Sequence, residues 1–200
     1  MLVEHQGRRP QVAPTAYVAP NAVVCGDVVV GEECRILFGA VVTAEGGRVE
    51  LGDQVIVMEQ AVVRGREGHP AVIGRHALIG PHAHVNGALL GEAVFLATGA
   101  SVFPGARLGG GAEVRINGVV HVNSVLGDEA LVPIGWVAVG DPARILPPGE
   151  HEAIWQLQRE LDFVGTVYGI EPASPAEEMA KITRGYAELF GHHRDDRIIG

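Results

Sequence analysis

The sequence predicts an all-β solenoid, and three observations indicate it. Twenty aliphatic residues recur at six-residue spacing between Val12 and Val132, apart from two insertions and one five-residue step from Val85 to Leu90. Four positions after most of them stands a small residue, usually alanine, and many of the 28 glycines fall at the turns between repeats. Neither the 3.6-residue period of a helix nor the alternation of a half-buried strand produces this pattern. Because one repeat cannot bury its apolar edge alone, the repeats must stack on one another.

The repeat unit, aliphatic-x-x-x-small-x, resembles the hexapeptide-repeat family of left-handed parallel β-helices. In that family three hexapeptides make one triangular coil, so the resemblance implies six to seven coils about 4.8 Å apart. We therefore expect a lead-in over 1–10, a left-handed β-helix over 11–146 and a helical extension over 147–200. Two insertions, 44–50 and 65–72, interrupt the repeat. Insertions on one side of a solenoid commonly line its functional face, and plain surface loops are the alternative.

The extension carries two helical patterns. Apolar residues at helical spacing predict a helix over 150–164. The run Ser174-Pro175-Ala176-Glu177 predicts the start of a second helix, because it combines an N-cap serine, a proline at the first helical position and a capping-box glutamate. Gly191 should end that helix. The charged tail over 192–197 is expected to be frayed.

Composition excludes several classes of partner. The formal net charge of −9 argues against nucleic acid and anionic membranes, because their phosphates attract a basic surface. The N-terminus lacks the apolar core of a signal peptide, and no apolar run approaches 18 residues. Cys25 and Cys34 are too few for a disulfide framework and are expected to be reduced thiols. These observations predict a cytoplasmic protein.

The order of motifs resembles the gamma-class carbonic anhydrases. The segments that carry the resemblance are Pro20-Asn21-Ala22, Gly26-Asp27, Ile79-Gly80 with Gly87, and Val139-Gly-Asp-Pro-Ala-Arg followed by a helix. Members of that family are homotrimers that hold zinc between subunits with three histidines. The resemblance therefore implies a homotrimer with a site in the cleft between its subunits.

The repeat also predicts which side chains stack on the outside of the solenoid. Residues one position after the aliphatic row and three repeats apart should form one outward column about 4.8 Å apart. These residues are Cys25, Thr43, Arg64, Asn86, Phe103 and His121. Two histidines at neighbouring positions of such a column would be close enough to share one zinc ion, because each bond from zinc to a histidine nitrogen is about 2.0–2.1 Å long.

The resemblance places Arg64, Pro81 and Asn86 at the three zinc-ligand positions. Proline offers no side-chain donor, and the guanidinium of Arg64 stays protonated and repels a cation. The standard zinc site is thus predicted to be lost, and hydration of carbon dioxide by a zinc hydroxide is not expected. No cofactor is assigned, and whether the chain is an enzyme stays open.

Three functions remain. The first is binding of a small anion by Arg64 and Asn86, with Thr43, Glu59 and His121 as further residues of the cleft. The alternative is a purely structural role, in which Arg64 forms an ion pair with Glu59 or Glu67 across the boundary between subunits.

The second function is a zinc hydratase or hydrolase with a displaced site. His82 and His84 are two apart on a segment expected to be extended, so both should project from one face and share a metal with His69 or His76. The third is an acyltransferase that uses coenzyme A, with His82 or His84 as general base. The chain lacks a basic cluster for the phosphates of that coenzyme.

Overall fold

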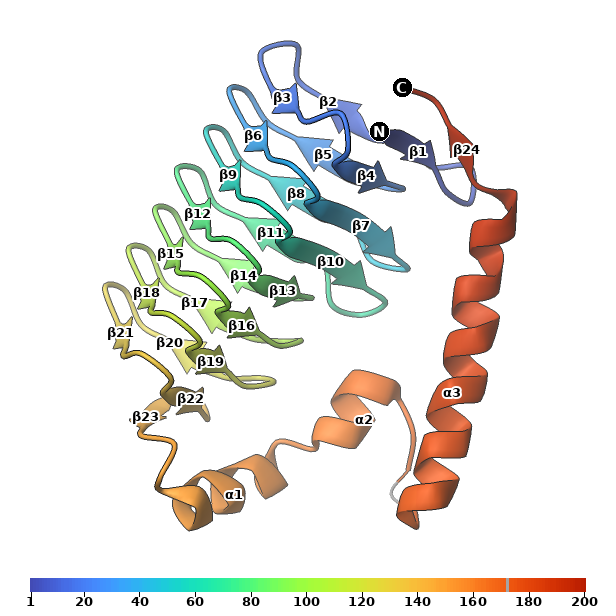
Figure 1. The fold of residues 1–200 in the computed structure, drawn as a ribbon. Helices are drawn as coiled ribbons and strands as arrows, with labels where there is room; N and C mark the ends of the chain where they lie inside the picture. The colour runs from blue at the N-terminus through green and yellow to red at the C-terminus, as the bar shows by residue number, and fades with distance from the viewer. Residues whose placement is uncertain (172) are drawn as a thin grey trace.

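The computed structural model describes residues 1–171 and 173–200 and shows a three-sided solenoid flanked by helices (Figure 1). The first two sheets hold seven parallel strands each. Those of the first sheet are β2 (Gln11–Val12), β5 (Val28–Val30), β8 (Val49–Leu51), β11 (Ala71–Ile73), β14 (Leu89–Leu90), β17 (Arg107–Leu108) and β20 (Val125–Leu126). Those of the second are β3 (Tyr17–Val18), β6 (Arg35–Ile36), β9 (Ile56–Val57), β12 (Leu78–Ile79), β15 (Phe95–Leu96), β18 (Glu113–Val114) and β21 (Leu131–Val132).

The third sheet holds ten strands. Eight of them run parallel: β1 (Leu2–Glu4), β4 (Val23–Cys25), β7 (Val41–Glu45), β10 (Val62–Arg66), β13 (His84–Asn86), β16 (Ser101–Val102), β19 (Val119–Val120) and β22 (Val137–Val139). Two antiparallel strands, β23 (Arg144–Leu146) and β24 (Arg197–Ile198), close its ends. The predicted solenoid with C-terminal helices is confirmed: seven coils of three strands are stacked, and β1 lies above the first of them.

The aliphatic row fills the interior of the solenoid. In the third sheet Val42, Val63 and Val85 lie directly above one another and are fully buried. The small residue of each repeat sits inside a corner, where Ala61 and Ala83 are 0% and 1% exposed. The residue before each corner alanine often takes a left-handed backbone, as at Gln60 with φ 58°. Larger side chains at the alanine positions would not fit, because the chain turns sharply there.

The two insertions lengthen β7 and β10 beyond the coil. The added residues stay paired, with Ala44 opposite Gly65 and Glu45 opposite Arg66. The backbones cross so closely that a Cβ on Gly65 would lie 2.2 Å from the carbonyl oxygen of Gly47. The insertions therefore form one protruding two-strand edge on the side of the third sheet.

The C-terminal extension forms α1 (His151–Glu160), α2 (Phe163–Tyr168), α3 (Pro175–Gly191) and a 3-10 turn over His192–Asp195. The helix predicted over 150–164 is confirmed over His151–Glu160, but its predicted end is wrong, because Asp162 adopts a left-handed backbone (φ 44°) that separates α1 from α2. Its Oδ1 accepts a hydrogen bond from the Gly165 amide at 3.0 Å, which starts α2. None of the helices in the described residues is long and apolar enough to cross a membrane.

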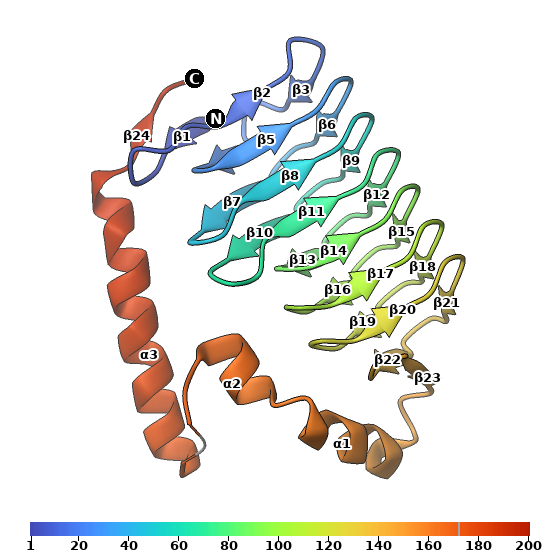
Figure 2. The same ribbon diagram turned by 180° about the vertical axis from the view of Figure 1, so that it is seen from behind.

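The second predicted helix is confirmed, and the carboxylate of Glu177 accepts hydrogen bonds from the backbone and hydroxyl of Ser174 at its start. The expectation of a frayed tail is wrong. Strand β24 pairs with β1, and the Ile199 amide donates to the Leu2 carbonyl at 2.8 Å. The helix α3 thus returns along the solenoid and brings the two termini side by side at the first coil (Figures 1 and 2).

Candidate functional site

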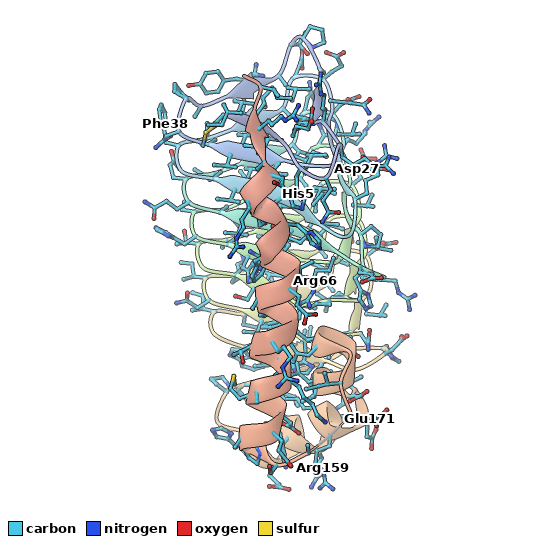
Figure 3. The ribbon with its side chains drawn as sticks, turned by 90° about the vertical axis from the view of Figure 1, so that its right-hand side faces the viewer. His5, Asp27, Phe38, Arg66, Arg159 and Glu171 are labelled. Carbon is cyan, nitrogen blue, oxygen red and sulfur yellow. The ribbon has the colours of Figure 1, made fainter. Side chains whose placement is uncertain are left out.

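The outer face of the third sheet looks toward the helical extension. Figure 3 shows α3 running along this face from the last coil to the first, with His5 near its C-terminal end and Arg66 beside its middle. Arg66, on the protruding edge, donates a hydrogen bond to the carbonyl of Val167 in α2. Its guanidinium also lies 5.9 Å from the ring centre of Tyr186 in α3. One arginine of the second insertion therefore holds both helices, as expected if the insertions line the functional face.

The outward column occurs with the predicted register. Cys25 pairs with Thr43, Thr43 with Arg64 and Arg64 with Asn86 on neighbouring strands. Further down, the rings of Phe103 and His121 stack with their centres 6.2 Å apart. The repeat determines this alignment once the two insertions and the five-residue step from Val85 to Leu90 are counted, because three repeats return the chain to the same side.

The centre of the column holds two buried polar atoms without hydrogen-bond partners, Nε of Arg64 and Oδ1 of Asn86. Asn86 is 7% exposed and Arg64 is half-buried. Such atoms are uncommon, because a buried donor or acceptor without a partner costs about 1–3 kcal/mol. A donor and an acceptor on adjacent strands are thus left without partners within one chain.

His84 lies half-buried on β13 beside this point. Burial lowers the pKa of His84, and the positive charge of Arg64 lowers it further, so the ring is neutral near pH 7. Its neighbour His82 does not share its strand. His82 stands exposed in a corner with φ 57°, before β13 begins, so the premise that both histidines occupy one extended segment is wrong. Within the described residues of one chain, neither belongs to a cluster of three possible metal ligands.

The other predicted cleft residues are placed differently. Thr43 is buried, and its hydroxyl donates a hydrogen bond to Glu45 at 2.9 Å. Glu59 lies half-buried just after β9, where its backbone carbonyl accepts a hydrogen bond from the His82 amide at 3.0 Å. The structure thus groups Arg64, Asn86 and His84, and it joins Thr43 to a different cluster.

Below this group lies an apolar pocket of about 630 Å³ between the sheet and the helices. Its lining comes from β16, β19, α1 and α2, and includes Phe103, His121, Trp155 and Phe163. The ring of Phe163 lies 6.0 Å from Phe103 and 5.7 Å from His121, measured between centres. Nδ1 of His121 is buried without a partner, and burial lowers the pKa of this histidine. No local sequence pattern indicates this pocket, because α1 and α2 are placed by long-range packing.

A second polar cluster lies at the top of the face, where the tail meets the first coil. It contains His5, Cys25, His193 and Asp196. The carboxylate of Asp196 lies between the two rings, 2.6 Å from Nδ1 of His5 and 2.7 Å from Nδ1 of His193. Burial, reinforced by the charge of Asp196, raises the pKa of the Cys25 thiol to about 11.

The carboxylates of Asp196 and Glu45 both act to raise the pKa of His193. Burial lowers its pKa, but the hydrogen bond to Asp196 and the charges of Glu45 and Asp196 outweigh burial, so the pKa is raised. Sequence reasoning missed the cluster, since His5 and Asp196 lie at opposite ends of the chain. The only available signal was the tail itself, with its run of histidines and aspartates over 192–196.

The chain is similar in sequence to several known proteins. No family model matches the chain. An uncharacterized protein of Dictyostelium discoideum is 33% identical over 76% of this chain, and a carbonic anhydrase of Geobacillus kaustophilus is 23% identical over 80% of it. The mitochondrial gamma carbonic anhydrase 1 of Arabidopsis thaliana is 28% identical over 70% of this chain. The aligned regions span 62%, 84% and 50% of these relatives, in that order.

Among solved structures, a putative acetyltransferase of Bacillus cereus matches with a TM-score of 0.53 at 19% identity, and it covers 93% of this chain and 95% of its own. This match shows the fold alone. The stacked hexapeptide coils define a hexapeptide-repeat protein of the left-handed β-helix class. Within that class the chain belongs to the gamma carbonic anhydrase-like family.

Proposed function

We propose that this protein is a homotrimer that binds a small anion at Arg64 and Asn86, in the place where its relatives are expected to hold zinc. The observation that carries the proposal is the pair of buried atoms without partners, Nε of Arg64 and Oδ1 of Asn86, on adjacent strands. A ligand that satisfied both would recover the free energy that their burial costs.

Zinc does not fit the residues at this point. Arg64 brings a permanent positive charge, and Pro81 has no side-chain donor, so two of the three family positions cannot coordinate a cation. The same charge favours an anion. We therefore derive no zinc hydroxide chemistry here.

The two open atoms also define the kind of anion. Arg64 donates hydrogen bonds to a negatively charged oxygen, whereas Oδ1 of Asn86 accepts one from an O–H group. An anion that carries both kinds of oxygen satisfies them together, as hydrogencarbonate and hydrogen phosphate do. The neutral ring of His84 adds a further hydrogen-bonding group without a repelling charge.

A second candidate is supported by the apolar pocket. Its volume of about 630 Å³ suits an acyl chain, and His121, which lines it and whose buried Nδ1 has no partner, is the candidate general base. An acyl-group hydrolase or transferase would use this pocket rather than His82 and His84. A zinc enzyme built from those two histidines and a neighbouring subunit stays a prediction, as does the cytoplasmic location.

The test of the first proposal is a titration of the full chain with hydrogencarbonate and, separately, inorganic phosphate, followed by the NMR signals of the Asn86 amide and the His84 ring. We expect saturable shifts of both signals with at least one of the two anions. Arg64→Met should weaken binding about 10- to 100-fold, because a hydrogen bond to a charged group contributes about 1.5–3 kcal/mol.

The matched control is Arg75→Met. Arg75 is an exposed arginine that pairs with Glu92 away from the third sheet, so its loss should leave the affinity unchanged. Equal affinity of the Arg64→Met variant and the unaltered protein, or the absence of saturable shifts with both anions, would refute anion binding at this point.

A further inference from the structure

The cluster at the top of the third sheet brings together three distant parts of the chain. His5 comes from the turn after β1, Cys25 ends β4, and His193 and Asp196 belong to the tail that follows α3. One ligand atom from each residue lies within 4.8 Å of every other. His5 and Cys25 are 4% exposed, so the cluster is shielded from solvent on the solenoid side. The anion site proposed above uses none of these residues.

The four donors match the preference of zinc. One thiolate, two imidazoles and one carboxylate form a mixed sulfur, nitrogen and oxygen set, and zinc takes four such ligands in a tetrahedron. Two donors of one tetrahedral zinc lie roughly 3.3–3.8 Å apart, given bonds of about 2.0–2.3 Å. Side-chain movements of less than about 1 Å therefore bring this set into range. A thiolate and a carboxylate also balance the charge of a divalent cation.

The surroundings of His193 add an independent feature of a metal site. Its Nδ1 faces the cluster, while its Nε2 lies 3.2 Å from Glu45 on β7. Glu45 is itself buried and held by the hydroxyl of Thr43 at 2.9 Å. Metal-binding histidines commonly donate their other ring N–H to a carboxylate, which fixes the tautomer and leaves the facing nitrogen free for the metal.

An entry path exists beside the cluster. His5 also lines a polar cavity of about 220 Å³ between the lead-in turn and the first insertion. The other lining residues are Gln6, Arg8, Asp27, Ala44, Gly46, Gly47 and Arg48. A hydrated ion can therefore approach His5 without unfolding the tail.

We propose that His5, Cys25, His193 and Asp196 bind one zinc ion that fastens the C-terminal tail to the first coil. On binding, Cys25 becomes a thiolate and releases its proton to solvent. Both histidines bind through a deprotonated Nδ1 and keep one proton on Nε2, which for His193 faces Glu45, and a second imidazole proton leaves to solvent. Asp196 exchanges its hydrogen bonds with the two histidines for a bond to the metal. The ion closes a loop that includes nearly the whole chain, so it stabilises the return of α3 along the third sheet.

The test uses the full chain, freed of metal with a chelator under reducing conditions and then titrated with cobalt(II), which reports on zinc sites by its absorption. We expect about one cobalt per chain, with the charge-transfer absorption of a thiolate ligand and the intense visible bands of tetrahedral cobalt. Zinc should displace the cobalt, and metal should raise the melting temperature.

Two variants and a matched control separate this site from others. Cys25→Ser should remove the charge-transfer band and weaken binding at least tenfold, whereas Cys34→Ser, which alters the other buried thiol, should change neither. Glu45→Gln should retain the band and weaken binding about 10- to 100-fold, as expected for a residue that positions a ligand. Far-ultraviolet circular dichroism checks that each variant is folded.

Three outcomes would overturn the proposal. The first is the absence of a thiolate band in the unaltered protein, and the second is unchanged cobalt affinity and melting temperature in Cys25→Ser. The third is metal binding that disappears in a variant lacking His82 and His84 but persists in Cys25→Ser. That last result would place the metal at the displaced site instead.

Discussion

Arg64 determines the electrostatics of the middle of the third sheet. Its charge lies beside His84 and favours the neutral form of that imidazole, so the two groups cannot easily both be positive. The described residues provide no ion pair for Arg64 within one chain, and its buried Nε has no hydrogen-bond partner. A pairing with Glu59 or Glu67 across a subunit seam therefore stays open as the structural alternative to an anion.

The charge of Arg64 makes the pKa of His84 a measurable reporter. Burial is the larger cause of the lowered pKa, and Arg64 is the second. We expect Arg64→Met to raise the pKa of His84 without restoring its usual value of about 6.5, because burial persists. An NMR titration of the His84 ring measures this value, with the Arg75→Met protein as control. An unchanged pKa would show that the two side chains do not interact.

The same lowered pKa has a consequence for stability. Since the folded state binds the proton less readily than the unfolded state, stability contributed by neutral His84 is present above pH 6.5 and is lost as the pH falls toward the folded-state pKa. A bound anion at Arg64 would weaken this loss, because it would cancel the positive charge beside the ring.

At the scale of single elements, the two insertions act as one unit. The ends of β7 and β10 stay paired beyond the coil and present Arg66 to α2 and α3. This pairing requires very close backbone contact, because a Cβ on Gly65 would lie 2.2 Å from the Gly47 carbonyl oxygen and 2.6 Å from that of Arg48. No side chain larger than hydrogen fits there without separating the two strands.

Gly65→Ala should therefore destabilise the protein by about 1–3 kcal/mol, the usual cost of forcing extra atoms into a packed site. Hydrogen exchange should also become faster in α2 and α3, since Arg66 loses its fixed position. The control is Gly127→Ala, because a Cβ at Gly127 meets no atom within 4 Å. Urea unfolding measures the free energies, and equal values for the two variants would contradict this account of the insertions.

Periodic elements could be predicted from the sequence, whereas the elements fixed by distant contacts could not. The column from Cys25 to Asn86 follows from counting the repeats and allowing for the two insertions, so its register could be predicted. The break at Asp162 was not, because its left-handed backbone is fixed by a local hydrogen bond that competes with a continuous apolar stripe. The pairing of β24 with β1 joins the two ends of the chain, and no local pattern encodes it.

In the candidate site, too, the residues that belong to the repeat could be predicted, and those placed by distant contacts could not. Arg64 and Asn86 were predicted as neighbours because both belong to the repeat. His82 was misplaced, since a corner residue with a positive φ interrupts the extended backbone that was assumed. The cluster around Asp196 and the apolar pocket lie where helices and tail meet the sheet, so each depends on tertiary packing that the repeat does not specify.

At the scale of the whole molecule, one side of the solenoid is unusual. The helix α3 runs its full length along the third sheet, yet none of its residues is buried. Trp155 of α1 and Met179 of α3 are each 56% exposed. Large apolar side chains grouped on one side of a protein commonly mark an interface. This side is therefore where we expect the neighbouring subunits of the proposed homotrimer to pack.

A charge placed at this side should break the trimer. We expect the unaltered protein to show a mass about three times that of the 21.0 kDa chain by light scattering, and Trp155→Glu to shift it toward a single chain. A buried carboxylate in a subunit interface costs several kcal/mol, which exceeds what a modest interface can offset. The control is Tyr17→Glu, an exposed aromatic residue (42%) on the second sheet, which should leave the mass unchanged. A single-chain mass for the unaltered protein would refute the homotrimer, and a trimeric Trp155→Glu protein would place its interface on another side of the solenoid.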